Sequence, residues 1–226
     1  MKNSTYILMA IFFISIACSV KGRQANKSTK TKVTKTLLLD FGFKVSLGQE
    51  EDFKTFKTYS FFELSKYGKT IYKDTSLEYE FGDKLYPIVL QTGKNKFELL
   101  FEINDRPNKN YLKRLIIKNY RVIKTDSLPT FISKATDLDN DGIKEYAGFW
   151  DYNEIWGESE TKTDYNPILY YKIKPTGLKL DSLLTKEKNT KIYGEFHGFE
   201  FNEKIEMPTT VLDKFEKEIK RITDKK

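Results

Sequence analysis

Short runs of aromatic and β-branched residues, separated by polar turn residues, fill most of the chain after residue 36. Such residues suit the half-buried surface of a sheet, and Phe and Tyr, 17 and 14 in number, recur throughout these runs. Gly, Asn, Asp or Pro stand between the runs, as they do in turns. We therefore expect strands over 37–45, 56–64, 70–72, 77–81, 85–92, 97–103, 112–124, 131–136, 145–150, 168–174 and 191–201, with turns at 48–52, 82–83, 93–95 and 175–177.

A different pattern begins near residue 207. Apolar residues recur there at helical spacing, so that one face is apolar: Val211, Leu212, Phe215, Ile219 and Ile222. Thr210 is placed to cap the first turn, and the basic pair at 220–221 lies near the end, where cations favour the helix dipole. The pattern predicts a mainly β fold of antiparallel sheets, a sandwich or part of a propeller, over 37–226. One C-terminal amphipathic helix at 209–222 closes a side of it.

The first residues of the chain form a targeting segment rather than part of the fold. Lys2 precedes the uncharged run 6–17, which is typical of a signal peptide and is shorter than the roughly 20 apolar residues of a bilayer-spanning helix. Ser15-Ile16-Ala17-Cys18 resembles the lipobox of bacterial lipoproteins. The resemblance implies removal of residues 1–17, lipidation of Cys18, and an exported protein anchored in the bacterial cell envelope on the periplasmic or outer-membrane side.

Residues 18–36 differ from the rest of the chain in charge. They contain six Lys and Arg residues and no acid, which is typical of a solvated tether. The tether is either a spacer or an added attraction to anionic lipid headgroups beside the lipid anchor. Residues 37–226 carry 32 basic and 32 acidic residues. Because the basic excess is confined to the N-terminal segments, it does not indicate nucleic-acid binding.

One motif carries chemistry. Residues 137–145 read DLDNDGIKE, with acids at the first, third, fifth and ninth positions and glycine at the sixth. Calcium prefers six to eight oxygen ligands, and a tight loop with alternate acids can direct several carboxylates to one centre. The predicted ligands are Asp137, Asp139, Asp141, the carbonyl oxygen of Ile143, and Glu145. The alternative is a turn of Asp, Asn and Gly without an ion. An EF-hand is excluded because its twelfth position, which needs Glu, is Gly148.

The segment 131–150 around this motif resembles the strand–loop–strand calcium hairpin of FG-GAP/VCBS repeats. The resemblance implies calcium held by Asp137, Asp139, Asp141 and Glu145. Repeats of this family build β-propellers, in which a period of about 40–50 residues would recur. Only one such loop occurs here, so we expect a single domain in which one calcium ion fixes a long hairpin.

Both tryptophans follow this hairpin, among several acids. Trp150, Tyr152 and Trp156 are candidates for stacking on a glycan or contacting a protein ligand. Two alternatives are glycoside hydrolysis by a pair of acids such as Glu154 and Glu158, and aromatic anchors packed on the sheet. In a further alternative, the loop 154–165 inhibits an external enzyme.

The absence of other motifs favours a binding role. His197 is the only histidine and Cys18 the only cysteine, which excludes multi-histidine zinc sites and His-Cys pairs. We expect His197 to be a packed strand residue. The sequence thus predicts a non-enzymatic, calcium-binding envelope lipoprotein with two partners: the membrane, through the lipid, and an unknown protein or glycan.

Overall fold

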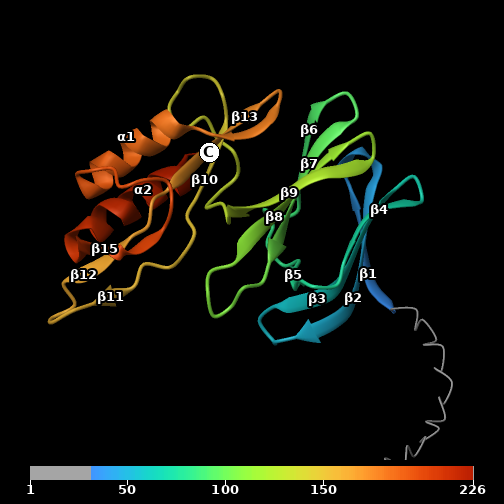
Figure 1. Ribbon diagram of the computed structural model, residues 1–226, viewed down its shortest axis with the longest axis horizontal. Helices are drawn as coiled ribbons and strands as arrows, with labels where there is room; N and C mark the ends of the chain where they lie inside the picture. Colours follow the sequence, from blue (N-terminus) through green and yellow to red (C-terminus); the bar gives the residue numbers. More distant parts are fainter. Residues whose placement is uncertain (1–31, 226) are drawn as a thin grey trace, which may run out of the picture. The chain divides into compact units, whose positions relative to one another are not determined.

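The computed structural model describes residues 32–225 (Figure 1). The predicted signal peptide, Cys18 and most of the predicted tether lie outside these residues. Within them, no helix is long and apolar enough to cross a membrane.

A large antiparallel sheet makes up the N-terminal part of the described chain. Its nine strands follow the order β1-β2-β3-β5-β7-β8-β9, with β4 paired to β3 and β6 paired to β7. The strands are β1 (Val33–Leu39), β2 (Phe43–Asp52), β3 (Lys57–Lys66), β4 (Lys69–Asp74), β5 (Tyr79–Glu80), β6 (Ile88–Gly93), β7 (Lys96–Ile103), β8 (Tyr111–Lys118) and β9 (Arg121–Pro129). Inward side chains such as Phe62 and Phe101 form its core. Strand β4 also lies against β9 but pairs only with β3, so the sheet is not closed.

Two smaller sheets and two helices follow. One sheet joins β10 (Glu145–Gly148), β13 (Leu169–Lys174) and β14 (Gly177–Leu180), and the other joins β11 (Ile155–Trp156), β12 (Lys162–Tyr165) and β15 (Asn202–Pro208). The helices are α1 (Ser182–Tyr193) and α2 (Leu212–Asp224), the latter preceded by a 3-10 turn at Thr209–Val211. Phe215 and Ile222 of α2 pack with Tyr170 in a second core.

A third core and a buried ion network join the large sheet to the β10-β13-β14 sheet. Leu100 and Leu112 of the large sheet pack with Leu178 of β14. Arg114 on β8 donates to Leu178 O (3.2 Å), and the N–H of Leu178 donates to Glu98 Oε2 (3.2 Å). Glu98 also lies 3.5 Å from Arg114, whose Nε donates to Asp126 Oδ1 at 2.6 Å. These contacts connect β7, β8 and β9 to β14.

Gly177 sits directly against this network. A Cβ atom at this position would lie 1.8 Å from Glu98 Oε1, and the backbone has φ +114. Both the close approach and the left-handed region require glycine.

The structure confirms a mainly β, antiparallel fold with an amphipathic C-terminal helix. Several details of the sequence prediction are wrong. The predicted strand 37–45 is interrupted by the 3-10 turn Asp40–Gly42, which separates β1 from β2. Thr210 lies within the 3-10 turn before α2, which begins without a side-chain cap. Strand β1 begins at Val33, inside the predicted tether 18–36, because 33–39 pairs with β2. The predicted turn 48–52 is the end of β2, paired with β3. The predicted strand 112–124 is a hairpin that turns at 119–120. The predicted strand 191–201 contains the end of α1 and a loop, so His197 is a loop residue that packs edge-on against Tyr165.

Helix α1 was missed because polar residues interrupt its buried face: Thr185 and Asn189 lie there beside Leu184, Ile192 and Tyr193. Thr185 Oγ1 accepts a hydrogen bond from the N–H of Tyr170, and Asn189 Oδ1 accepts one from the N–H of Ile168. Both side chains are fully buried. A buried face that mixes polar and apolar residues gives only a weak helical pattern of hydrophobic residues in the sequence.

Candidate metal centre

The segment 131–150 forms a hairpin held at both ends. Thr136 and Glu145 exchange backbone hydrogen bonds of 3.0 and 2.9 Å, and Phe131 bridges Gly148. A Cβ atom at Gly148 would lie 2.4 Å from Thr130 O, so glycine permits this close pairing. The predicted strand 131–136 is therefore reduced to two isolated bridges around an irregular stretch.

Asp137 shapes the loop between these ends. Its carboxylate accepts hydrogen bonds from the N–H groups of Asp141 (3.1 Å) and Gly142 (3.0 Å). Gly142 has φ +85 and Asn140 has φ 66, and both residue types tolerate this left-handed region. The Asp, Asn and Gly positions of the motif thus produce a tight turn that brings its acids together.

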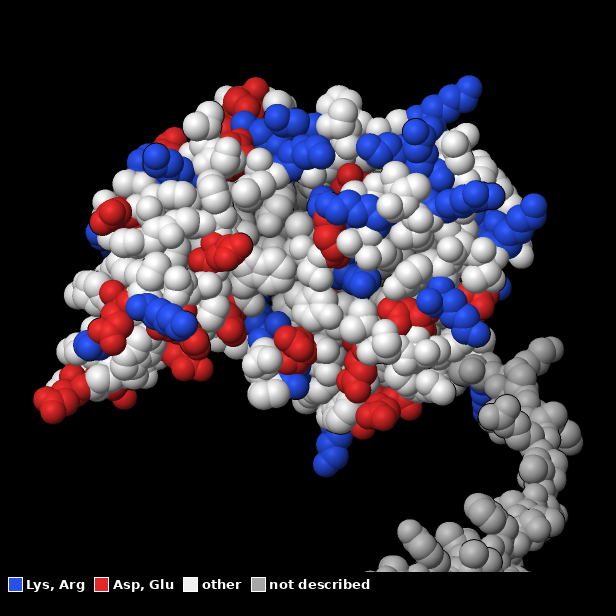
Figure 2. All heavy atoms as spheres, viewed as in Figure 1, with Lys and Arg blue, Asp and Glu red and all other residues white. Residues whose placement is uncertain are grey.

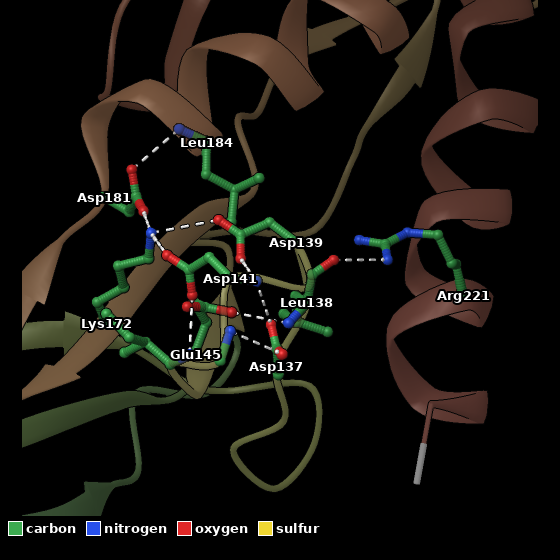
Figure 3. Close-up of polar contacts among 11 residues, drawn as sticks. Asp137, Leu138, Asp139, Asp141, Glu145, Lys172, Asp181, Leu184 and Arg221 are labelled. Atoms are coloured by element: carbon green, nitrogen blue, oxygen red, sulfur yellow. Dashed lines mark hydrogen bonds and ion pairs between the residues drawn. The ribbon is translucent and has the colours of Figure 1, made fainter.

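Three of the predicted acidic ligands converge. Asp137, Asp139 and Glu145 each offer a carboxylate oxygen, and these oxygens lie within 4.8 Å of one another (Figure 3). Glu145 is fully buried; its Oε2 accepts a hydrogen bond from the N–H of Leu138 (2.7 Å). Its Oε1 is buried and has no hydrogen-bond partner among residues 32–225. Oxygens at this separation can share a cation whose metal–oxygen distances are about 2.3–2.6 Å.

The environment of Glu145 penalises its charge. Burial, together with the carboxylates of Asp139 and Asp141, raises the pKa of Glu145 to about 7 against the opposing hydrogen bond from Leu138 and the charge of Lys172. A divalent cation between these carboxylates would reverse the penalty, because it favours the ionised form.

Asp141, the fourth predicted acid, is turned away toward a lysine. Its Oδ2 lies 2.7 Å from Lys172 Nζ, and its Oδ1 accepts a hydrogen bond from the N–H of Ile143 (2.8 Å). The same ammonium lies 3.2 Å from Asp139 and 2.6 Å from Asp181. The hydrogen bond from Lys172 lowers the pKa of Asp141. For Ile143 the observed contact is its N–H, and its carbonyl oxygen remains a predicted ligand.

The loop is connected to both helices (Figure 3). Asp181, which contacts Lys172, is the N-cap of α1 and accepts a hydrogen bond from the N–H of Leu184 (3.0 Å). Arg221 of α2 donates to the carbonyl of Leu138 (3.2 Å), and the Leu138 side chain is buried in the second core. A well-ordered loop therefore helps to fix the positions of β13, α1 and α2.

Sequence reasoning missed Lys172 and Asp181. Lys172 stands in the otherwise apolar and aromatic run 169–173, and a lone charge in such a strand is the signal that could have identified it. No comparable signal marks Asp181, because a single Asp before a helix is explained by capping alone.

The aromatic candidates do not form one platform. Trp150 is partly buried against the third core, Tyr152 is 59% exposed, and Trp156 lies half-buried on β11. Among the residues described, none of these three rings takes part in an aromatic pair. Their role in ligand binding stays a prediction.

The structure also shows where the acids near the two tryptophans lie. Glu154 and Glu158 are exposed, and the N–H of Glu154 donates to Asp164 Oδ2 at 3.3 Å. Asp164 is buried on β12, and burial raises its pKa. The sequence analysis did not single out Asp164, since it lies beyond the cluster of acids around the tryptophans.

Comparison of the chain with protein-family models, with curated proteins and with solved structures finds no match.

Proposed function

We propose that the chain is an exported, lipid-anchored binding or interaction module whose loop 137–145 holds one structural calcium ion. The observation that supports this most strongly is the buried Oε1 of Glu145, which has no hydrogen-bond partner among residues 32–225, on a carboxylate that converges with those of Asp137 and Asp139. A buried acceptor without a partner is costly, and a bound cation would satisfy it.

The residues present fit such an ion. Asp137, Asp139 and Glu145 supply carboxylate oxygens, which suit a hard cation, and Asp141 would join them on leaving Lys172. Calcium would supply positive charge and a common centre for these oxygens. Lys172 provides the only ammonium among residues 32–225 that forms an ion pair with the loop acids Asp139 and Asp141. The four loop carboxylates thus retain a negative excess that attracts a divalent ion.

Replacing the lysine tests whether it competes with the ion. Lys172→Met is expected to raise calcium affinity about tenfold, because removal of a nearby like charge favours a cation by at least about 1.4 kcal/mol. Isothermal titration calorimetry with calcium chloride measures the change. Without calcium the variant is expected to be less stable than the parent, since three acids lose their shared partner.

Lys191→Met is the matched control. Lys191 pairs with Glu187 on the surface of α1 and is 67% exposed, so its loss should leave calcium affinity unchanged. Absence of calcium uptake by both Lys172→Met and the parent chain would contradict a calcium site in this loop.

The membrane part of the proposal is carried by Cys18, which lies outside the described residues. Cys18→Ser is expected to abolish lipid attachment, because the side chain that accepts the lipid is removed. When the full chain is expressed in a lipoprotein-processing bacterium and partitioned in detergent, the parent should enter the detergent phase and the variant the aqueous phase. Equal partitioning of both proteins would contradict lipidation.

A further inference from the structure

A cavity of about 620 Å³ opens where the large sheet fails to close. It lies between the turn that joins β3 to β4 and the turn that joins β8 to β9, and its wall includes Ile71 of β4 and Val122 of β9. Strands β4 and β9 approach each other here without a shared ladder. The volume is within the range of about 300–1,000 Å³ that small-molecule sites occupy.

A buried lysine forms part of the cavity wall. Lys66 is 5% exposed, and within residues 32–225 it has neither an ion pair nor a hydrogen bond through its side chain. Its Nζ instead lies 4.4 Å from the ring centroids of both Phe43 and Phe97 and 5.1 Å from that of Tyr120. Burial lowers the pKa of Lys66. Aromatic rings stabilise the ammonium only in part, and an anion would be a stronger partner.

Two further cations line the cavity. Lys69 and Arg121 are exposed, and neither forms an ion pair in the part of the chain that the structure describes. Thr70, also in the wall, donates its hydroxyl to Glu63 at 3.2 Å. Figure 2 shows Lys and Arg gathered on the end of the large sheet where β4 and β9 lie. The wall therefore carries an unbalanced positive charge.

Two tyrosines project from the turns beside Lys66. Tyr67 has φ 50 and Tyr120 has φ 61, a left-handed backbone that is rare for bulky residues. Their rings meet edge to face at 5.8 Å, and Tyr67 is 75% exposed. Glycine or asparagine would adopt this backbone with less strain. A need for both rings at a ligand-binding surface would explain why these turn positions hold tyrosine.

We propose that this cavity binds a small acidic saccharide, whose carboxylate or phosphate accepts hydrogen bonds from Lys66 while its ring packs on Tyr67 and Tyr120. Lys69 and Arg121 add attraction at the rim. Tyrosine faces suit the C–H face of a sugar ring, and charge-assisted hydrogen bonds fix the acidic group. The inference is independent of calcium, because no ligand of the proposed metal centre lines the cavity.

Titration of the full chain by two-dimensional NMR tests the proposal. D-Glucuronate and D-glucose 6-phosphate should each shift amide signals of 66–71 and 119–122, and the two arms show whether a carboxylate or a phosphate is preferred. D-Glucose and inorganic phosphate should each bind at least tenfold more weakly, because each lacks one of the two groups recognised. Inorganic phosphate that binds as tightly as D-glucose 6-phosphate would overturn the saccharide part of the proposal.

Two variants separate charge from ring contacts. Lys66→Met keeps an unbranched side chain among the rings and should lower the affinity for both acidic sugars at least tenfold. Tyr67→Asn suits the left-handed backbone and should weaken them about fivefold, while its melting temperature stays within a few degrees of the parent. Unchanged affinity in either variant would overturn the role given to that residue.

Matched controls lie outside the cavity. Lys204→Met removes an exposed charge and Phe199→Asn an exposed ring, and both should bind the sugars like the parent. Glu145→Gln, which removes a proposed calcium ligand, should also leave sugar binding unchanged. Failure of calcium binding would therefore not affect this result.

Discussion

Calcium is expected to raise the melting temperature of the full chain by about 5–10 °C at a concentration one hundred times its Kd. An ion that binds only the folded state stabilises it by about 2.7 kcal/mol at that excess, and about 1 kcal/mol shifts a domain of this size by about 2–4 °C. Differential scanning calorimetry with calcium chloride and with a chelator measures the shift.

Glu145→Gln should abolish that shift while leaving the calcium-free protein at least as stable as the parent. The carboxamide oxygen can still accept the hydrogen bond from Leu138, and the buried charge beside Asp139 is removed. In calcium, the variant should be less stable than the parent because a ligand oxygen with negative charge is lost. A merely structural role of Glu145 predicts the same effect in both conditions.

The exposed acid Glu158 provides the control, and Glu158→Gln should keep the full calcium shift. Identical melting curves of the parent chain with calcium and with chelator would contradict the metal centre.

Arg114→Met is expected to lower the free energy of unfolding by about 3 kcal/mol, the largest effect we expect of a single substitution. Its guanidinium is 12% exposed and Glu98 is 3% exposed, so the substitution leaves a carboxylate buried without its cation. The carbonyl of Leu178 also loses its donor from Arg114. Equilibrium unfolding in urea, followed by circular dichroism, measures the loss.

Arg114 also pairs with Asp126, and Lys124, the second cation on that carboxylate, gives a matched comparison. Lys124 lies 2.9 Å from Asp126 but is 61% exposed, so Lys124→Met should cost less than about 1 kcal/mol. Adding Glu98→Gln to Arg114→Met should recover part of the loss, because the uncompensated charge disappears. An equal loss of unfolding free energy in Arg114→Met and Lys124→Met would show that burial of the network does not add to stability.

The sequence predicted those features that depend on local pattern. Runs of aromatic and β-branched residues located most strands, and the stripe from Val211 to Ile222 located α2. The acids of the loop were also visible, because their spacing lies within one short segment. Lys172 could not be placed there, since it reaches the loop only through the pairing of β10 with β13.

The cavity at the open side of the sheet was also invisible in the sequence. Its wall comes from 66–71 and 119–122, which meet only because the sheet curves until β4 lies against β9. Tyr120 lay within the predicted strand 112–124 and Tyr67 between two predicted strands, and their left-handed backbone is known only from the structure.

The network of Glu98 and Arg114 has a practical consequence for dividing the chain. A cut near residue 130 would look natural between the large sheet and the two smaller ones. It would separate Leu100 and Leu112 from Leu178, and Glu98 would lose the hydrogen bond that the N–H of Leu178 donates. Each fragment would then expose the apolar side chains of this core to solvent, so we expect it to aggregate rather than fold independently. Laboratory production therefore has to keep both halves on one polypeptide.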